Sequence, residues 1–221
     1  MPGVEIVARR NSCSLDGQTQ NHQVKPLPIG ILGSGQGSNC RAILERIRSS
    51  DLAAETRVVI SDVLDAPILD IAQEFSVANA YLPPGQFRTR LEPEAEKQIV
   101  KMLREAGVHL VVLAGFMRVL HAPMLTAFPQ RIINIHPSLL PKFAGLEAWK
   151  QALAAGETVT GCTVHYVDEK IDHGRIIAQQ EIAIFPDDTP ESLHARIQMA
   201  EHELYPAAIA KFCEKYAAAN L

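Results

Sequence analysis

Three polar residues of this chain could together carry out acyl transfer to an amine. Asn134 and His136 lie in the run Asn-Ile-His-Pro-Ser-Leu-Leu-Pro, and Asp172 follows 36 positions after His136. Attack of an amine on a carbonyl carbon creates a tetrahedral oxyanion, which a side-chain amide and a protonated imidazole can stabilise. A carboxylate beside the imidazole favours its protonated form and can also move the proton that the nitrogen releases. The three residue types therefore predict an oxyanion site with its own proton acceptor.

A short apolar segment places Asn134 and His136 on the same side of the chain. Residues 131–135 read Arg-Ile-Ile-Asn-Ile, which is typical of a short buried strand. Alternate side chains of a strand share a face, and ligands of open α/β sheets bind beyond the carboxyl ends of the strands. We therefore expect both side chains in one site. Taken singly, each also has an ordinary interpretation, because Asn134 could cap a turn and His136 could be a hydrogen-bonded loop histidine.

A glycine-rich turn, Gly-Ser-Gly-Gln-Gly-Ser over residues 33–38, predicts a phosphate site. It lies between an apolar run and a predicted helix, where backbone N–H groups can approach an anion at the positive end of the helix dipole. The alternative is a tight turn without a ligand, since glycine is also the default turn residue.

Two better-known phosphate motifs fit this turn less well. A dinucleotide fingerprint needs a third glycine at position 38, which is Ser38, and a P-loop needs a lysine directly after the glycines. Asp62 stands at the end of the second predicted strand, where a ribose-binding acid of the dinucleotide motif would be. We interpret Asp62 instead as a polar strand end that faces solvent or as a turn residue.

Apolar strands alternate with amphipathic segments from Leu27 onward, which is typical of a Rossmann-like, mostly parallel sheet with helices on both faces. The run 109–114 is the most continuous apolar segment and is predicted to be the central strand. Two segments of period two surround the loop 168–174 and indicate antiparallel strands toward the C-terminal part. The predicted strands are 29–32, 57–61, 77–82, 109–114, 131–135, 160–167 and 175–184, and the predicted helices are 39–48, 67–75, 91–106, 146–155 and 190–216.

Composition narrows the possible partners. The chain has 221 residues, 47% of them hydrophobic, with a net charge of −4, so it can form a large core but offers no basic footprint for nucleic acid or a membrane surface. Its apolar runs are too short to span a bilayer, and residues 1–26 lack the apolar core of a signal peptide, so we expect a flexible tail before a single domain, residues 27–221. We expect a cytoplasmic protein that acts on small molecules, as a monomer or homodimer.

The sequence shows no pattern that predicts a metal site. The four cysteines are scattered without any C-x-x-C pair, which predicts reduced thiols (Cys13, Cys40, Cys162 and Cys213). His194 and His202 are eight residues apart on the last predicted helix, unlike the i, i+4 spacing of helical zinc ligands. We interpret these two histidines and Glu201 between them as a solvated helix face.

Beyond these motifs, the chain closely resembles the family of folate-dependent phosphoribosylglycinamide formyltransferases, the glycinamide ribonucleotide transformylases of purine synthesis. The resemblance extends over about residues 28–216. It is carried by Gly35–Asn39, Val111–Arg118, Asn134–Pro141 with Gly145, Thr163–His165, Asp172–Gly174, and Glu201-His202 with Tyr205-Pro206.

The resemblance implies a role for each matching residue. Asn134, His136 and Asp172 match the catalytic trio, with 10-formyltetrahydrofolate as the formyl donor. Three further groups match binding residues: Gly37, Ser38 and Asn39 for the nucleotide phosphate, Glu201 for the ribose hydroxyls, and Arg88, Phe116, Met117, Arg118, Val167 and Asp168 for the folate. His165 also keeps its place in the family pattern, although a histidine within a strand is more often a hydrogen-bonded structural residue than a proton carrier.

Several positions depart from the family pattern. Asp62 follows Ser61 where relatives often have asparagine, and His173 stands where glycine is frequent after the catalytic acid. Glu147 and Trp149 occupy positions where histidines are often found. The first two departures concern loops beside the expected site, and the last two remove side chains that could contribute to it.

Alternative functions of three kinds remain. Methionyl-tRNA formyltransferase and formyltetrahydrofolate hydrolase share the same polar trio but carry an additional domain, for which 221 residues leave little room. A formyltransferase acting on a sugar amine is harder to separate, although the phosphate turn favours a ribonucleotide. A noncatalytic nucleotide-binding module on the same fold is the third alternative, because fold alone does not determine function.

Overall fold

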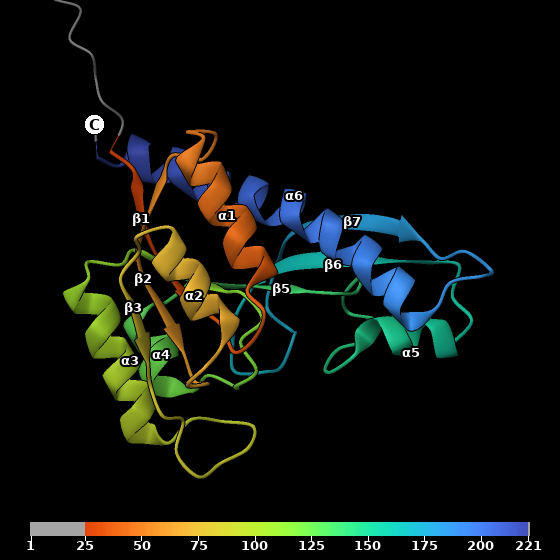
Figure 1. Cartoon of the computed structure of the whole chain (residues 1–221), viewed down its shortest axis with the longest axis horizontal. Helices are drawn as coiled ribbons and strands as arrows, with labels where there is room; N and C mark the ends of the chain where they lie inside the picture. Colours follow the sequence, from red (N-terminus) through yellow and green to blue (C-terminus); the bar gives the residue numbers. More distant parts are fainter. Residues whose placement is uncertain (1–24, 221) are drawn as a thin grey trace, which may run out of the picture.

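The computed structural model describes residues 25–220, which form a seven-stranded sheet covered by helices (Figure 1). The strand order is β3-β2-β1-β4-β5-β6-β7. Neighbouring strands from β3 to β5 pair in parallel, whereas β6 is antiparallel to β5 and to β7. The predicted Rossmann-like sheet with antiparallel strands in its C-terminal part is confirmed. The expected tail, residues 1–26, lies outside the described residues except for its last two.

All seven predicted strands and all five predicted helices are present, and their bounds differ from the prediction by at most three residues. The strand predicted as central, β4, is the fourth of seven across the sheet. The strands are β1 (Leu27–Leu32), β2 (Ala54–Ser61), β3 (Asn79–Tyr81), β4 (Leu110–Leu113), β5 (Ile132–His136), β6 (Val159–Tyr166) and β7 (Ile176–Ala183). The helices are α1 (Ser38–Arg48), α2 (Pro67–Glu74), α3 (Pro93–Glu105), α4 (Ala122–Ala127), α5 (Ala148–Ala154) and α6 (Pro190–Ala218).

Alternating side chains of the parallel strands form two hydrophobic cores, one on each face of the sheet. On β4, Leu110 and Val112 pack under α1, α2 and α6, whereas Val111 and Leu113 pack under α3 and α4. Burial on both faces explains why these strands read as continuous apolar runs. Ile133 and Ile135 of β5 belong to the first core, so the residues that alternate with them face the other side.

The last helix, α6, crosses the molecule from β1 to the antiparallel strands (Figure 1). It begins at a capping box, in which Thr189 and Ser192 exchange side-chain hydrogen bonds with each other's backbone N–H, followed by Pro190. Tyr205 is fully buried, and its hydroxyl lies within hydrogen-bond distance of two strand carbonyls, 2.9 Å from Leu113 O and 3.1 Å from Ile133 O. The helix therefore fixes the ends of β4 and β5 relative to each other.

One short helix was not predicted. α4 has six residues and begins with proline at its first turn, which is too short for a helical period to be recognised in the sequence. Among residues 25–220, no helix combines the length and hydropathy that crossing a membrane requires.

Candidate active site

Strand β5 places Asn134 and His136 on one face, at the carboxyl end of the parallel part of the sheet. His136 is the last residue of the strand and is only 5% exposed, and Asn134 is partly exposed. Two residues of the neighbouring strand β6 lie opposite them, since the register pairs Asn134 with His165 and His136 with Thr163. The four polar side chains therefore meet on the face of the sheet that carries α3 and α4.

Asp172, from the loop between β6 and β7, lies next to His136. The distance from His136 Nδ1 to Asp172 Oδ2 is 3.2 Å, and His136 Nε2 lies 2.9 Å from the carbonyl oxygen of Phe143. A carbonyl only accepts hydrogen bonds, so Nε2 must carry a hydrogen, and Nδ1 faces a carboxylate. The imidazolium, with a hydrogen on both nitrogens, satisfies both contacts, whereas a neutral ring satisfies one.

The backbone holds the Asp172 carboxylate in a fixed direction. Asp172 has a left-handed backbone (φ 49°), and its Oδ2 accepts a hydrogen bond from Gly145 N at 2.9 Å. Within the described residues its other oxygen, Oδ1, has no hydrogen-bond donor. Oδ1 lies 3.7 Å from His165 Nε2, which is beyond hydrogen-bond distance. One carboxylate oxygen is thus engaged, and the other remains able to accept a proton.

His165 orients the amide of Asn134. Its Nδ1 donates to the carbonyl of Tyr166 at 2.8 Å, so in the neutral ring Nε2 is an acceptor, and Asn134 Nδ2 lies 3.2 Å from it. Burial lowers the pKa of His165, which favours this neutral form. One amide hydrogen of Asn134 is held by His165, and the second is left for an oxyanion. His165 thus has the hydrogen-bonded structural role that is expected for a histidine within a strand. The signal for its position was the alternation that puts Thr163 and His165 on one face.

The predicted phosphate turn has the geometry of an anion site. Gly37 caps α1 with φ 74°, and no side chain caps the helix and no acidic residue lies in its first turn. The first helical bond runs from Arg41 N to Gly37 O, so the N–H groups of residues 38–40 are not used by the helix. A side chain at position 37 would meet Ile68 at 2.9 Å, so both the backbone angle and the packing require glycine.

Glu201 is buried beside this turn, so the interpretation of Glu201 as part of a solvated helix face is wrong. It is only 6% exposed, and Asn39 Nδ2 donates to its Oε2 at 2.8 Å, joining residues 162 positions apart. Burial raises the pKa of Glu201 to about 7. Asn39 Oδ1 is buried and has no partner among the described residues. The Glu201 carboxyl group, whose pKa lies near neutral pH, and the Asn39 side-chain oxygen, which has no partner among the described residues, therefore lie next to the anion turn.

The sequence matches the family described as formyl transferase over residues 28–209, which is most of the chain. The chain belongs to the formyl transferase family. A curated relative, the phosphoribosylglycinamide formyltransferase of Haemophilus influenzae, is 39% identical over 84% of this chain and 87% of its own length. A crystal structure of glycinamide ribonucleotide transformylase 1 from Symbiobacterium toebii has a TM-score of 0.84 at 44% identity and covers 90% of this chain and 93% of that one.

Other curated relatives are much longer than the present chain. The trifunctional purine biosynthetic protein adenosine-3 of Homo sapiens is 36% identical over 93% of this chain. The matched region is only 20% of that human protein, and 15% of the corresponding protein of Drosophila pseudoobscura pseudoobscura. The chain thus spans a small part of these relatives, and most of the Haemophilus protein.

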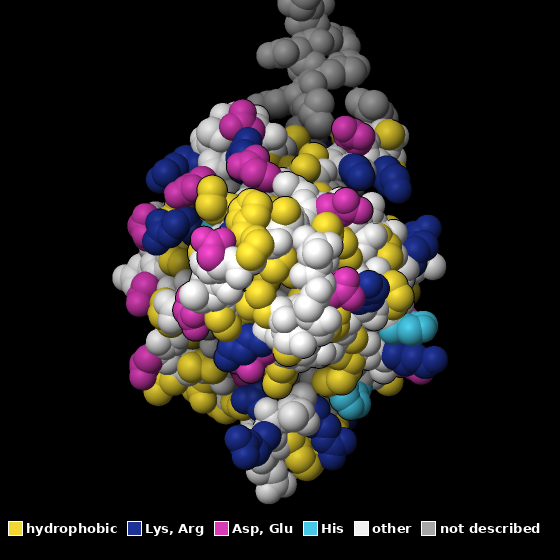
Figure 2. Space-filling view, turned by 90° about the vertical axis from the view of Figure 1, so that its right-hand side faces the viewer, with side chains coloured by type: hydrophobic (Ala, Val, Ile, Leu, Met, Phe, Trp, Pro, Cys, Tyr) yellow, Lys and Arg dark blue, Asp and Glu magenta, His cyan; other side chains and the backbone are white. Residues whose placement is uncertain are grey.

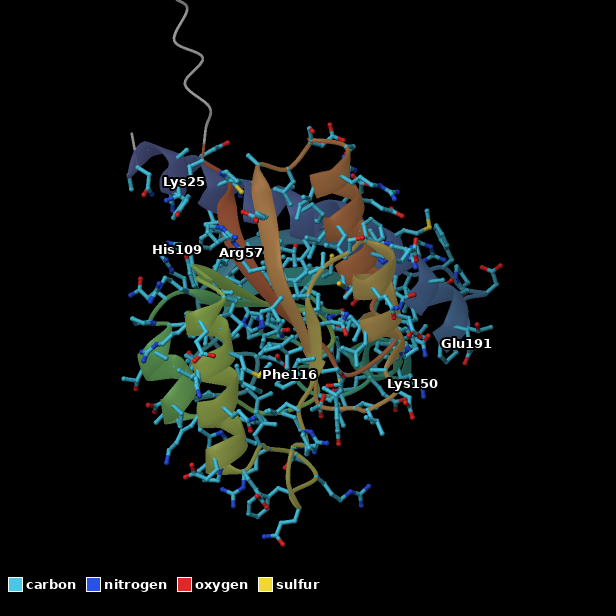
Figure 3. All side chains as sticks on the ribbon, turned by 60° about the vertical axis from the view of Figure 1, so that its left-hand side comes forward. Lys25, Arg57, His109, Phe116, Lys150 and Glu191 are labelled. Atoms are coloured by element: carbon cyan, nitrogen blue, oxygen red, sulfur yellow. The ribbon has the colours of Figure 1, made fainter. Side chains whose placement is uncertain are left out.

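The residues expected to contact folate lie around the same end of the sheet as Asp172. Phe116 is 8% exposed and belongs to the core under α3 and α4, close to the ends of β1 and β2 (Figure 3). Met117 is 58% exposed, and Arg88 is exposed in the loop between β3 and α3. Val167 and Asp168 are partly exposed at the start of the loop that carries Asp172.

The interpretation of Asp62 as a polar strand end that faces solvent is wrong, although Asp62 does lie in the bend directly after β2. Asp62 is 4% exposed and accepts a hydrogen bond from Arg118 Nε at 2.6 Å. The guanidinium of Arg118, predicted to bind folate, is thus bound to Asp62 and also donates to two backbone carbonyls of the β3–α3 loop. A buried carboxylate needs such a partner, and a single sequence does not reveal it.

The positions that depart from the family pattern have structural partners. Glu147 has a left-handed backbone (φ 54°) at the start of α5 and pairs with Lys150. Trp149 stacks on His194 with ring centres 3.8 Å apart. His173 Nδ1 lies 3.1 Å from Asp168 Oδ2, within the loop that carries Asp172. Among residues 25–220, no group of three or more His, Cys, Asp or Glu side chains is arranged to hold a metal ion.

Proposed function

We propose that this formyltransferase moves the formyl group of 10-formyltetrahydrofolate to the amine of glycinamide ribonucleotide, a step of purine biosynthesis, and that the catalytic unit is the domain over residues 27–221. One observation carries the proposal. An amide, two imidazoles and a carboxylate are joined by successive contacts of 3.2, 3.7 and 3.2 Å, from Asn134 through His165 and Asp172 to His136. The family membership supports the same reaction.

In this mechanism the amine nitrogen attacks the formyl carbon, and the carbonyl oxygen becomes an oxyanion. Asn134 stabilises it with the amide hydrogen that His165 does not use. The His136 imidazolium adds a positive charge, and its Nδ1 hydrogen can be shared with the oxyanion, because Nε2 is held by Phe143 O. Donors fixed before the reaction stabilise developing charge most effectively, because they need no reorganisation when it forms.

Asp172 accepts the proton released by the attacking amine. Its Oδ2 is occupied by Gly145 N and by His136, so Oδ1 is the oxygen that takes the proton. When the tetrahedral intermediate collapses, the bond between the formyl carbon and N10 of the folate breaks, and N10 receives that proton from Asp172, directly or through water. The products are N-formylated glycinamide ribonucleotide and tetrahydrofolate, and Asp172 is again ionised.

The remaining binding roles follow the geometry of the anion turn and its surroundings. The N–H groups of Gly37, Ser38 and Asn39 would hold the substrate phosphate at the start of α1. Glu201, beside Asn39, would accept hydrogen bonds from the ribose hydroxyls. The folate would lie against residues of three loops beside Asp172, of which Arg88 and Met117 are the exposed ones (Arg88, Phe116, Met117, Arg118, Val167 and Asp168).

The direct test is to follow formyl transfer by absorbance with purified protein, glycinamide ribonucleotide and a 10-formylfolate analogue. We expect turnover that needs both substrates. An amino sugar phosphate in place of the ribonucleotide tests the sugar-amine alternative. Binding of the ribonucleotide without turnover, by folded protein, would contradict the proposal and favour a noncatalytic nucleotide-binding module.

A further inference from the structure

Asp62 makes contacts that extend over three loops at the carboxyl end of the sheet. It follows β2, and its side chain is only 1% exposed. Its two oxygens have different partners: Oδ1 accepts the hydroxyl hydrogen of Ser34 at 2.5 Å, and Oδ2 accepts Arg118 Nε–H at 2.6 Å. We call this set of contacts, with those that Ser34 and Arg118 make in turn, the Asp62 clasp.

The first arm of the clasp joins the glycine turn to the segment after β4. Because Ser34 gives its only hydroxyl hydrogen to Asp62, its oxygen is free to accept, and Met117 N donates to it at 2.9 Å. Ser34 N also donates to Gly115 O at 3.0 Å. The Asp62 carboxylate thus sets the direction of the hydroxyl that holds the backbone of Met117.

The second arm reaches the loop between β3 and α3. Arg118 Nη1 donates to the carbonyl of Phe87 at 2.8 Å and to that of Arg88, while Nε stays on Asp62. The loop extends to the lower end of the molecule in Figure 1, and Lys and Arg side chains gather at the same lower end in Figure 2. Apart from the clasp, an isolated parallel β-bridge between Arg90 and Val119 joins this loop to the segment after β4, with Val119 N donating to Thr89 O at 2.9 Å.

We infer that Asp62 is a positioning residue for the folate-facing wall of the site. Two of the three guanidinium nitrogens of Arg118 are engaged by the protein, so Arg118 acts mainly by fixing the loop that carries Arg88. Because both arms start from one carboxylate, Met117 and Arg88 keep a fixed position relative to each other before any ligand binds. A preformed wall binds its ligand more tightly, since less order is lost on binding. This inference rests on the proposed function for its ligand but not for its geometry.

The geometry is tested by limited trypsin digestion, which needs no substrate. Arg88 and Arg90 are cleavage sites within the loop that the clasp holds. We expect Asp62→Asn to be cut there about tenfold faster than the wild type, because local opening exposes the bonds. Asp65→Asn is the matched control, an exposed aspartate in the same β2–α2 connection, and should be cut like the wild type. Equal cutting of Asp62→Asn and Asp65→Asn would overturn the clasp.

Arg118→Lys tests the same loop if Asp62→Asn does not fold. Lysine keeps a positive charge for Asp62 but lacks the planar fork that reaches Phe87 and Arg88 at the same time. We expect faster cutting after Arg88 and Arg90, with the thermal midpoint close to that of the wild type. Cutting at the wild-type rate in this folded variant would show that the fork does not hold the loop.

Steady-state kinetics test the link to folate. For Asp62→Asn we expect the KM for the 10-formylfolate donor to rise by about tenfold, while kcat and the KM for glycinamide ribonucleotide change by less than about twofold. Equal increases in both KM values, or a loss confined to kcat, would overturn a role specific to the folate wall. Absence of turnover in the wild type would refute the proposed function alone, because the digestion experiment would still report on the clasp.

Discussion

Replacing Glu201 by glutamine should change how protein stability depends on pH. Glu201 is buried, its pKa is raised to about 7 by that burial, and its one hydrogen-bond donor is the neutral amide of Asn39. Glutamine has nearly the same shape and can accept the same hydrogen bond. It cannot ionise, so it imitates the protonated acid at every pH.

The size of the effect follows from proton linkage. Between a pKa of 4.5 for an ordinary Glu and about 7 for Glu201, the folded protein binds more protons than the unfolded chain, so stability falls as pH rises. The contribution is fully present below pH 4.5 and is lost by about pH 8. At 1.36 kcal/mol per pKa unit the whole shift is about 3 kcal/mol, and most of it is lost between pH 5 and 8. Glu201→Gln should therefore gain about that much relative to the wild type across this range.

The measurement is urea denaturation of wild type and Glu201→Gln at several pH values from 5 to 8. The histidines whose pKa is lowered by burial titrate in both proteins, so their effect cancels in the difference (His109, His165, His194 and His202). Glu214→Gln, at an exposed position of the same helix, is the control and should show no such trend. A difference between wild type and Glu201→Gln that stays constant with pH would refute the reasoning.

Three further predictions concern the site and the core. Asn134→Ala should reduce kcat by on the order of 10²–10³-fold, measured as formyl transfer, and near-normal turnover would remove Asn134 from the oxyanion site. His165→Leu should reduce kcat by about 10- to 100-fold at unchanged thermal midpoint, because the Asn134 amide loses the acceptor 3.2 Å away, and an unaltered kcat would contradict that role. Tyr205→Phe should lower the free energy of unfolding in urea by about 1 kcal/mol, because the buried hydroxyl hydrogen shared between Leu113 O and Ile133 O is lost, whereas an unchanged value would mean that this hydrogen bond does not stabilise the fold.

The sheet could be predicted from the sequence because its strands follow simple rules. The central parallel strands are buried on both faces and read as continuous apolar runs, and β6 and β7 could be predicted from the short polar loop between them. Asn134 and His136 could be placed on one face for the same reason, since the strand period is two. The same alternation places His165 on one face of β6, but its pairing with Asn134 could not be predicted, because the register between β5 and β6 depends on how two distant segments pair.

The burial of two acidic side chains could not be predicted from the sequence. Asp62 and Glu201 are acidic residues whose types predict solvent exposure, yet both are nearly inaccessible. Asp62 is buried because Arg118, 56 positions later, folds back over it, and Glu201 because α6 crosses over the start of α1. Tertiary packing alone brings each acidic residue to the segment that buries it, so no local sequence pattern predicts the burial.

In the proposed mechanism the two imidazoles beside Asp172 take different protonation states, neutral for His165 and cationic for His136. His165 must keep a lone pair on Nε2, because a hydrogen there would face the Asn134 amide hydrogen and turn the amide away from the oxyanion. His136 needs hydrogens on both nitrogens, since both face acceptors. The two rings differ in which nitrogen donates its hydrogen to a backbone carbonyl. Tyr166 O holds the hydrogen of His165 on Nδ1, away from Asp172, whereas Phe143 O holds the hydrogen of His136 on Nε2, so that any second proton lies against the carboxylate. Two backbone carbonyls thus fix a hydrogen on Nε2 of His136 and on Nδ1 of His165, which leaves Nδ1 of His136 facing Asp172 and Nε2 of His165 facing the Asn134 amide.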